Sequence, residues 1–151
     1  MQTTDNYMEL TFPAHSQNEA FARVCAAAFA ARLDCTIDEL TDIKTAISEA
    51  VTNAIVHAYP ARSGKVLLRG SINGNTVRFE IQDFGCGIEN IEQAMQPFFS
   101  TGNSAERSGM GFTVMQSFMD TVAVHSQPGQ GTVVRLEKTI LSQNTECLIH
   151  A

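Results

Sequence analysis

The chain has 151 residues, of which 44% are apolar, and a net charge of −6. This length fits a single domain, which we expect over residues 1–140, followed by a C-terminal tail over residues 141–151. The acidic charge balance argues against direct nucleic-acid binding, whose affinity comes largely from Lys and Arg on phosphates, and suits a basic protein partner instead.

The N-terminal third predicts a strand and an alanine-rich helix. Residues 7–12 alternate as in a strand that ends at Pro13. Ser16 and Glu19 have the spacing of a capping box for a helix over residues 18–33. Its predicted apolar face consists of Phe21, Val24, Cys25, Ala28 and Phe29. Arg23 and Arg32 lie outside this face; for Arg23, a solvated helix surface and a partner contact are both open.

A second, longer helix is predicted over residues 37–59, after a capping box of Thr36 and Glu39 and before Pro60. Glu49 and Asn53 are four residues apart, so they project from one side, next to the apolar stripe of this helix. Carboxylate and amide oxygens suit Mg²⁺, with the carboxylate able to polarise a nucleophile, although an ordinary helix pair has the same spacing. His57, one turn further on, is typical of a helix end rather than a ligand.

A β-hairpin is predicted over residues 65–72 and 76–83, because Asn73-Gly74-Asn75 separates two β-rich runs. It delivers Asp83 at the end of its second strand. A carboxylate there can accept a hydrogen bond from the amino group of a ligand, or can simply initiate a turn.

Two glycine pairs flank a polar segment: Gly85 with Gly87, and Gly109 with Gly111. Such pairs suggest a phosphate-bearing ligand, and the second pair opens an apolar helix whose N-terminal N–H groups could face an anion. Arg107 is the only cation of the loop between them, and either pairs with a phosphate or remains solvated.

A short helix after Gly87 and a closing hairpin over residues 121–127 and 131–140 complete the predicted elements. The fold class that follows is α/β (α+β): a two-layer sandwich with helices on one face of a mixed, mainly antiparallel sheet. No apolar run is long enough to span a membrane and no secretion signal is visible, so we expect a cytoplasmic protein. The four cysteines form no C-x-x-C pair, which argues against zinc and favours free thiols.

The motifs match a known superfamily in order and spacing. Glu49-x-x-x-Asn53, Asp83-x-Gly85-x-Gly87 and Gly109-x-Gly111 resemble the N, G1 and G2 boxes of the Bergerat-fold (GHKL) ATPases. The texts "DELTDIKTAISEAVTNAIVHAY", "ERSGMGFTVMQSFMD" and "GQGT" are similar to the anti-sigma F factors of spore-forming bacteria, which are serine kinases of this superfamily. The likeness covers nearly the whole chain and implies the Bergerat ATP-binding fold.

The resemblance implies roles for matching residues. Glu49 would be the general base that activates a substrate serine, and Asn53 would be the Mg²⁺ ligand. Asp83 would accept a hydrogen bond from the adenine amino group of ATP. Gly87 would lie beside the adenine ring, and Thr132 would support this contact through water. Gly85 belongs to the same implied cofactor-binding set.

The loop over residues 100–111 would close over the phosphates of ATP. Arg107 would face the γ-phosphate as a catalytic residue. The other positions implied to contact the cofactor there are Thr101, Ser108, Gly109, Met110 and Gly111. Where the family pattern has a lysine after the loop's threonine, this chain has Gly102 and Asn103, which removes a possible phosphate contact.

The implied activity is transfer of the γ-phosphoryl group of ATP to a serine of an anti-anti-sigma protein, together with sequestration of sigma F to control sporulation transcription. Arg23 matches an arginine of the family's partner-binding helix, and the family implies a homodimer. Two alternatives remain at this point. One is a nucleotide-gated sigma-binding module without significant kinase activity, and the other is an anti-sigma B type kinase of the stress response.

Overall fold

The computed structural model describes residues 6–59, 64–96 and 111–141. Five strands and four α-helices follow one another along these residues. They are β1 (Asn6–Pro13), α1 (Asn18–Ala30), a 3-10 turn (Ala31–Leu33), α2 (Ile37–Val56), β2 (Lys65–Asn73), β3 (Thr76–Asp83), α3 (Ile91–Ala94), α4 (Gly111–Phe118), β4 (Thr121–Gln127) and β5 (Gly131–Thr139).

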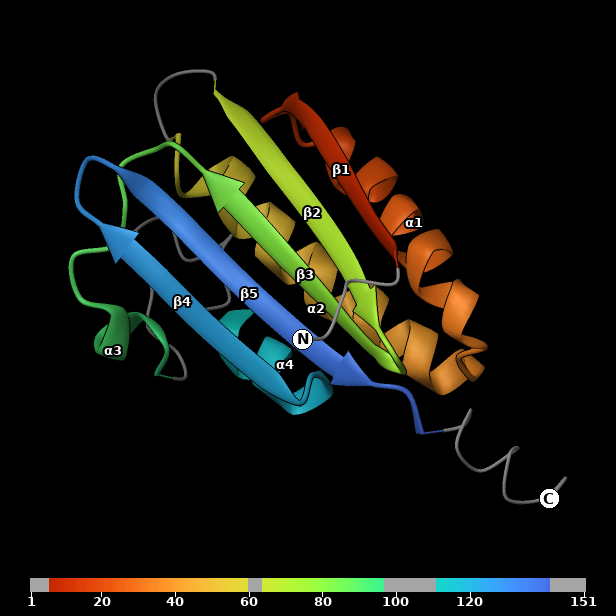
Figure 1. Ribbon diagram of the computed structural model, residues 1–151. Coiled ribbons are helices and arrows are strands. Elements are labelled where there is room, and N and C mark those ends of the chain that lie inside the picture. Colours follow the sequence, from red (N-terminus) through yellow and green to blue (C-terminus); the bar gives the residue numbers. More distant parts are fainter. Residues whose placement is uncertain (1–5, 60–63, 97–110, 142–151) are drawn as a thin grey trace, which may run out of the picture.

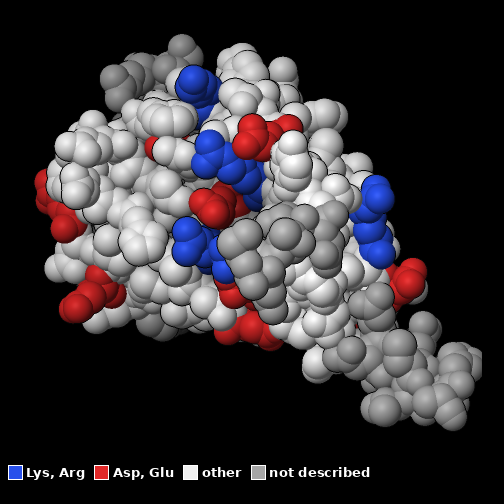
Figure 2. All heavy atoms as spheres, in the orientation of Figure 1, with Lys and Arg blue, Asp and Glu red and all other residues white. Residues whose placement is uncertain are grey.

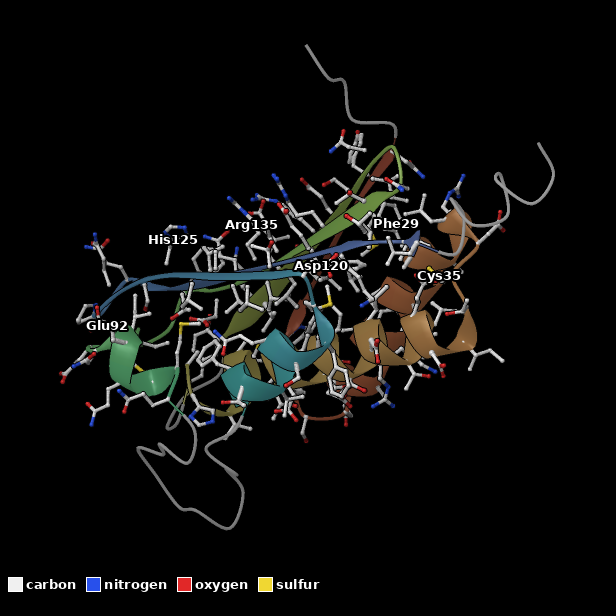
Figure 3. The ribbon with its side chains drawn as sticks, turned by 90° about the horizontal axis from the view of Figure 1, so that it is seen from below. Phe29, Cys35, Glu92, Asp120, His125 and Arg135 are labelled. Carbon is white, nitrogen blue, oxygen red and sulfur yellow. The ribbon has the colours of Figure 1, made fainter. Side chains whose placement is uncertain are left out.

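The strands form one sheet in the order β1-β2-β3-β5-β4, and α1, α2 and α4 lie on one face of it (Figure 1). All four pairings of the described strands are antiparallel, so the sheet is antiparallel rather than mixed, while the predicted two-layer sandwich is confirmed. Figure 3 shows the two layers edge-on, with Phe29 between α1 and the sheet. Its ring meets that of Phe79 edge to face, with the centroids 6.2 Å apart.

The β2–β3 hairpin forms where the sequence predicts it, around Gly74, whose φ is +60°. A glycine with positive φ as the first of two turn residues is typical of tight hairpins. The register then places Asp83 opposite Val66 on one side and opposite Thr132 on the other. Asp83 therefore lies at the end of a central strand, between two neighbours.

The capping box predicted for α1 is wrong, and of its predicted apolar face only Phe29 is buried. Its N-cap is Gln17, without a side-chain cap, and only the backbone carbonyl of Ser16 contacts the Glu19 N–H, at 3.2 Å. Phe21 and Val24 are 53% and 61% exposed, and the buried positions are Ala22, Ala26, Phe29 and Ala30. The small alanines let the helix approach its neighbours closely, with Phe29 packed inward and Phe21 and Val24 left outside.

Helix α2 confirms most of its prediction. Thr36 and Glu39 form the capping box, with the Thr36 hydroxyl 3.0 Å from the Glu39 N–H. Ile43 and Ile47 on its predicted stripe are fully buried. The helix ends at Val56 with His57 as C-cap, three residues before the predicted end. The residues after it belong to the site described below.

The other face of the sheet carries interleaved charges (Figure 2). Three ion pairs cross neighbouring strands there: Arg69 with Glu9, Arg78 with Glu137, and Arg135 with Glu80. Pairs this exposed contribute at most about 1 kcal/mol each. Figure 3 shows Arg135 and His125 on this face, away from the helices. Within the described residues, no helix is both long and apolar enough to cross a membrane.

Candidate functional site

Glu49 and Asn53 lie half-buried at the edge of α2, where α4 begins. A Cβ atom added to Gly111 would lie 3.2 Å from Asn53 Nδ2 and 3.3 Å from Glu49 Oε2. The start of α4 is therefore held directly against both side chains, and its first-turn N–H groups have no partner within the helix. The structure thus brings together the predicted carboxylate, the predicted amide and the last of the predicted glycines.

The electrostatic setting of Glu49 suits proton transfer. Burial raises the pKa of its carboxyl, and the nearby carboxylate of Glu19 raises it further. A carboxylate is a better base when its pKa moves towards the working pH, provided that it stays ionised often enough to accept a proton. Glu49 is therefore the candidate for a general base.

Asp83 is a buried carboxylate, only 6% exposed. Its Oδ1 accepts hydrogen bonds from the N–H of Gly85 at 3.1 Å and of Thr132 at 3.2 Å. Burial raises the pKa of the Asp83 carboxyl, and these two N–H groups oppose the rise. Among the described residues Oδ2 accepts no bond, so one oxygen is anchored and the other remains able to accept from a ligand amino group.

Thr132 belongs to a hydroxyl pair beside Asp83. Its Oγ1 lies 2.8 Å from Ser126 Oγ, which also donates to the Gly131 carbonyl at 2.9 Å and accepts from the Ile88 N–H at 2.8 Å. Since Ser126 gives its one proton to the carbonyl, Thr132 must be the donor between the two hydroxyls. Ser126 was not predicted from the sequence, because its partners come from two segments, Ile88 in one and the adjacent Gly131 and Thr132 in the other.

The glycines of the Asp83 turn are explained by contacts with the chain itself. A Cβ on Gly85 would lie 2.1 Å from the Ala58 carbonyl oxygen, and one on Gly87, whose φ is +76°, would lie 2.1 Å from the Gln127 carbonyl oxygen. No larger residue fits either position without a backbone shift. The turn is thereby fixed between the end of α2 and the β4–β5 connection.

Tyr59 is a second residue that the sequence analysis missed. Its hydroxyl accepts from the Phe84 N–H at 2.7 Å and donates to the Lys65 carbonyl at 2.8 Å. It joins the segment after α2 to the turn after Asp83. Only the fold reveals it, because the bonded residues are distant in sequence.

Arg23 lies close to the base but is engaged within the chain. Its guanidinium donates to Glu19 at 3.0 Å and to Ser48 Oγ at 3.3 Å. Ser48 is adjacent to Glu49, so α1 contacts α2 at the residue next to the carboxylate. Thr101, Arg107, Ser108, Gly109 and Met110, together with the C-terminal tail after residue 141, lie outside the described residues.

The residues fit a magnesium–nucleotide ligand better than a metal held by protein alone. In the described part of the chain, no group of three His, Cys, Asp or Glu side chains could hold a metal ion. Asn53 and Glu49 supply hard oxygens of the kind that suit Mg²⁺, which keeps several waters and bonds to phosphates. Cys25, Cys35 and Cys86 are free thiols, as predicted.

Known proteins resemble the chain over most of its length. The model of the histidine kinase-like ATPase domain matches residues 12–138. An anti-sigma F factor of Thermoanaerobacter sp. (strain X514) is 57% identical over 135 residues, which cover 89% of this chain and 94% of that protein. One of Anoxybacillus flavithermus is 54% identical, covering 94% of this chain and 98% of that protein.

A solved structure supports the fold. The crystal structure of the RsbU and RsbW domains of a Mycobacterium tuberculosis protein superposes with a TM-score of 0.65 at 18% identity. The match covers 89% of this chain and 32% of that one. At 18% identity this similarity supports a shared fold and nothing beyond it.

Proposed function

Since the chain belongs to the anti-sigma F factors, within the histidine kinase-like ATPase family, we propose that it binds Mg²⁺ and ATP and phosphorylates a serine of an anti-anti-sigma protein. We also propose that it sequesters sigma F and thereby controls sporulation transcription. The names of the relatives favour sigma F over the sigma B alternative. The observation that carries the kinase proposal is Glu49, a base with a raised pKa beside Asn53 and the start of α4.

In this proposal Asp83 and its surroundings bind the adenine. Oδ1 is held by two backbone N–H groups, so Oδ2 can accept from the adenine amino group. The hydroxyls of Thr132 and Ser126 stand beside it and fix its environment. This buried end sets the nucleotide's orientation, with its phosphates towards Asn53 and Gly111.

The transfer step requires one base and accurate positioning. Glu49 accepts the proton of the acceptor serine as the serine oxygen forms its bond to the γ-phosphorus, and the bond from that phosphorus to the bridging oxygen of ADP breaks. Bound Mg²⁺ and ATP supply the phosphoryl group and neutralise its charge. Asn53 would hold the ion. The residues that would contact the phosphates are Thr101, Arg107, Ser108, Gly109, Met110 and Gly111.

We further propose a homodimer. Strand β1 is an edge strand of the sheet, and Phe21 and Val24 are exposed on α1 beside it. An unpaired edge next to exposed apolar side chains favours association with another chain. Light scattering on the purified protein would give twice the chain mass if this is right.

The proposed function is tested by label transfer. The protein is incubated with Mg²⁺, γ-labelled ATP and the anti-anti-sigma protein of the same organism, with and without sigma F. Label on a serine of the anti-anti-sigma protein, and sigma F bound in the presence of nucleotide, are the expected results. Binding of ATP and sigma F without any label on that protein would contradict the kinase and favour a nucleotide-gated binding module.

A further inference from the structure

A hollow lies between α1 and α2, and Glu49 is one of the residues that line it. Its volume is about 310 Å³. Its lining residues are Arg23 from α1 and Thr41, Lys44, Thr45, Ser48 and Glu49 from α2. One wall of the hollow is therefore the base itself, and the others are cations and hydroxyls.

The position of Glu49 along α2 separates two chemical environments. The rise along the axis of an α-helix is about 1.5 Å per residue. Measured along the axis of α2, Asn53 is therefore about 6 Å from Glu49 towards the end of the helix, and Lys44 is about 7.5 Å from it towards the start. Asn53 belongs to the side where the nucleotide is proposed to bind. The side towards Lys44 is where an acceptor hydroxyl can approach the carboxylate without crossing the nucleotide.

The two cations of the hollow differ in their availability. Arg23 is paired with Glu19 at 3.0 Å, so its charge is largely compensated. Lys44 is exposed and forms no ion pair with any described residue. In a chain of net charge −6, an unpaired cation in a hollow next to the base is a local attraction for anionic groups.

We propose that this hollow receives an acidic segment of the phosphate-accepting protein, and that Lys44 is the residue that positions it by pairing with a carboxylate of that segment. The inference rests on the kinase activity proposed above. Glu49 lines the hollow and Glu19 pairs with the lining residue Arg23, and these two negative charges disfavour a free multivalent anion such as phosphate. A side-chain carboxylate held on a protein segment can meet Lys44 while the rest of the segment contacts the hydroxyls of Thr41 and Thr45.

The test is steady-state kinetics of Lys44→Glu and Lys44→Ala with the anti-anti-sigma protein of the same organism as acceptor. Lys44→Glu should raise the KM for the acceptor by about tenfold or more, with kcat and the KM for ATP changed by less than about twofold. Lys44→Ala should show a smaller rise and a weaker dependence of that KM on salt. The matched control is Arg32→Glu, an equal charge change at an exposed cation outside the hollow, which should leave all three constants unchanged.

Two outcomes would overturn the inference. One is an unchanged acceptor KM in Lys44→Glu, and the other is an equal rise in Arg32→Glu, which would indicate only a general charge effect. Charge reversal of single acidic residues of the acceptor to Lys should include one that restores the KM with Lys44→Glu, and failure of every reversal would also count against a direct pair. If the wild-type protein transfers no phosphate at all, the proposed function fails first, so the two failures are distinguishable.

Discussion

The Asp83→Asn substitution tests separately the hydrogen bonds that this carboxyl accepts within the protein and its proposed hydrogen bond with adenine. Asn keeps an oxygen at the Oδ1 position, so the hydrogen bonds from Gly85 and Thr132 at 3.1 and 3.2 Å survive. At the Oδ2 position it presents an N–H₂ group, which faces the adenine amino group donor to donor. Loss of one hydrogen bond to a charged group costs about 1.5–3 kcal/mol, which lowers ATP affinity about 10- to 150-fold.

The folding stability of Asp83→Asn at pH 7, unlike its ATP affinity, is not expected to fall. Because burial raises the pKa of Asp83 in the folded state, its protonated form is favoured by folding. The corresponding stability is fully present below the ordinary pKa of Asp and is lost as pH rises through the raised value. Asn carries no charge at any pH, so Asp83→Asn should be at least as stable as the wild type at pH 7, with the advantage disappearing in acid.

Asp83→Ala is the contrasting variant. It leaves the N–H groups of Gly85 and Thr132 without an acceptor in a buried place, at about 1–3 kcal/mol each. A total of about 2–6 kcal/mol is a large part of the 5–15 kcal/mol typical of a domain. Calorimetric titration with ATP and thermal melts at pH 4 and pH 7 measure both effects. Wild-type ATP affinity in Asp83→Asn would refute the adenine contact, and equal stability of the two variants would refute the anchoring role.

Two further predictions concern the base and the turn. Glu19→Gln removes a charge that raises the pKa of Glu49, so the acid limb of the pH–rate profile should move to lower pH; an unmoved limb would show that the two carboxylates are not coupled. Gly87→Ala should lower the melting temperature much more than Gly129→Ala. Both glycines have similar positive φ, +76° and +78°, which costs about 1–2 kcal/mol for Ala, but only at Gly87 does the added Cβ also meet a carbonyl oxygen, that of Gln127. Equal melting temperatures would contradict the packing explanation.

The elements that depend only on neighbouring residues were predicted correctly from the sequence. The Thr36–Glu39 capping box and the Gly74 turn depend on neighbouring residues only, and both formed as predicted. The predicted face of α1 was wrong except at Phe29, because apolar bulk was taken as the sign of burial. The helix instead buries alanines and exposes Phe21 and Val24, a choice that only the shape of the packed layer decides.

Some residues of the candidate site were likewise predicted from the sequence and others were not. Glu49 and Asn53 were singled out by their spacing beside a buried face, and Asp83 by its place between a strand and a glycine turn. Their proposed roles came from the resemblance to the GHKL ATPases. Tyr59 and Ser126 were not found, because each has a hydrogen bond to a distant segment, Tyr59 to Phe84 over 25 residues and Ser126 to Ile88 over 38 residues. Such bonds follow from the fold, and no pattern within either segment indicates them.

Single-turnover phosphoryl transfer by Glu49→Gln, beside the wild type, tests the account most directly. Each protein is preloaded with Mg²⁺ and γ-labelled ATP and mixed with the anti-anti-sigma protein. We expect unchanged ATP and sigma F binding in Glu49→Gln, with transfer slowed at least about 100-fold, the usual contribution of a general base. Transfer at a rate close to the wild type would contradict it, because Glu49 would then not be the base.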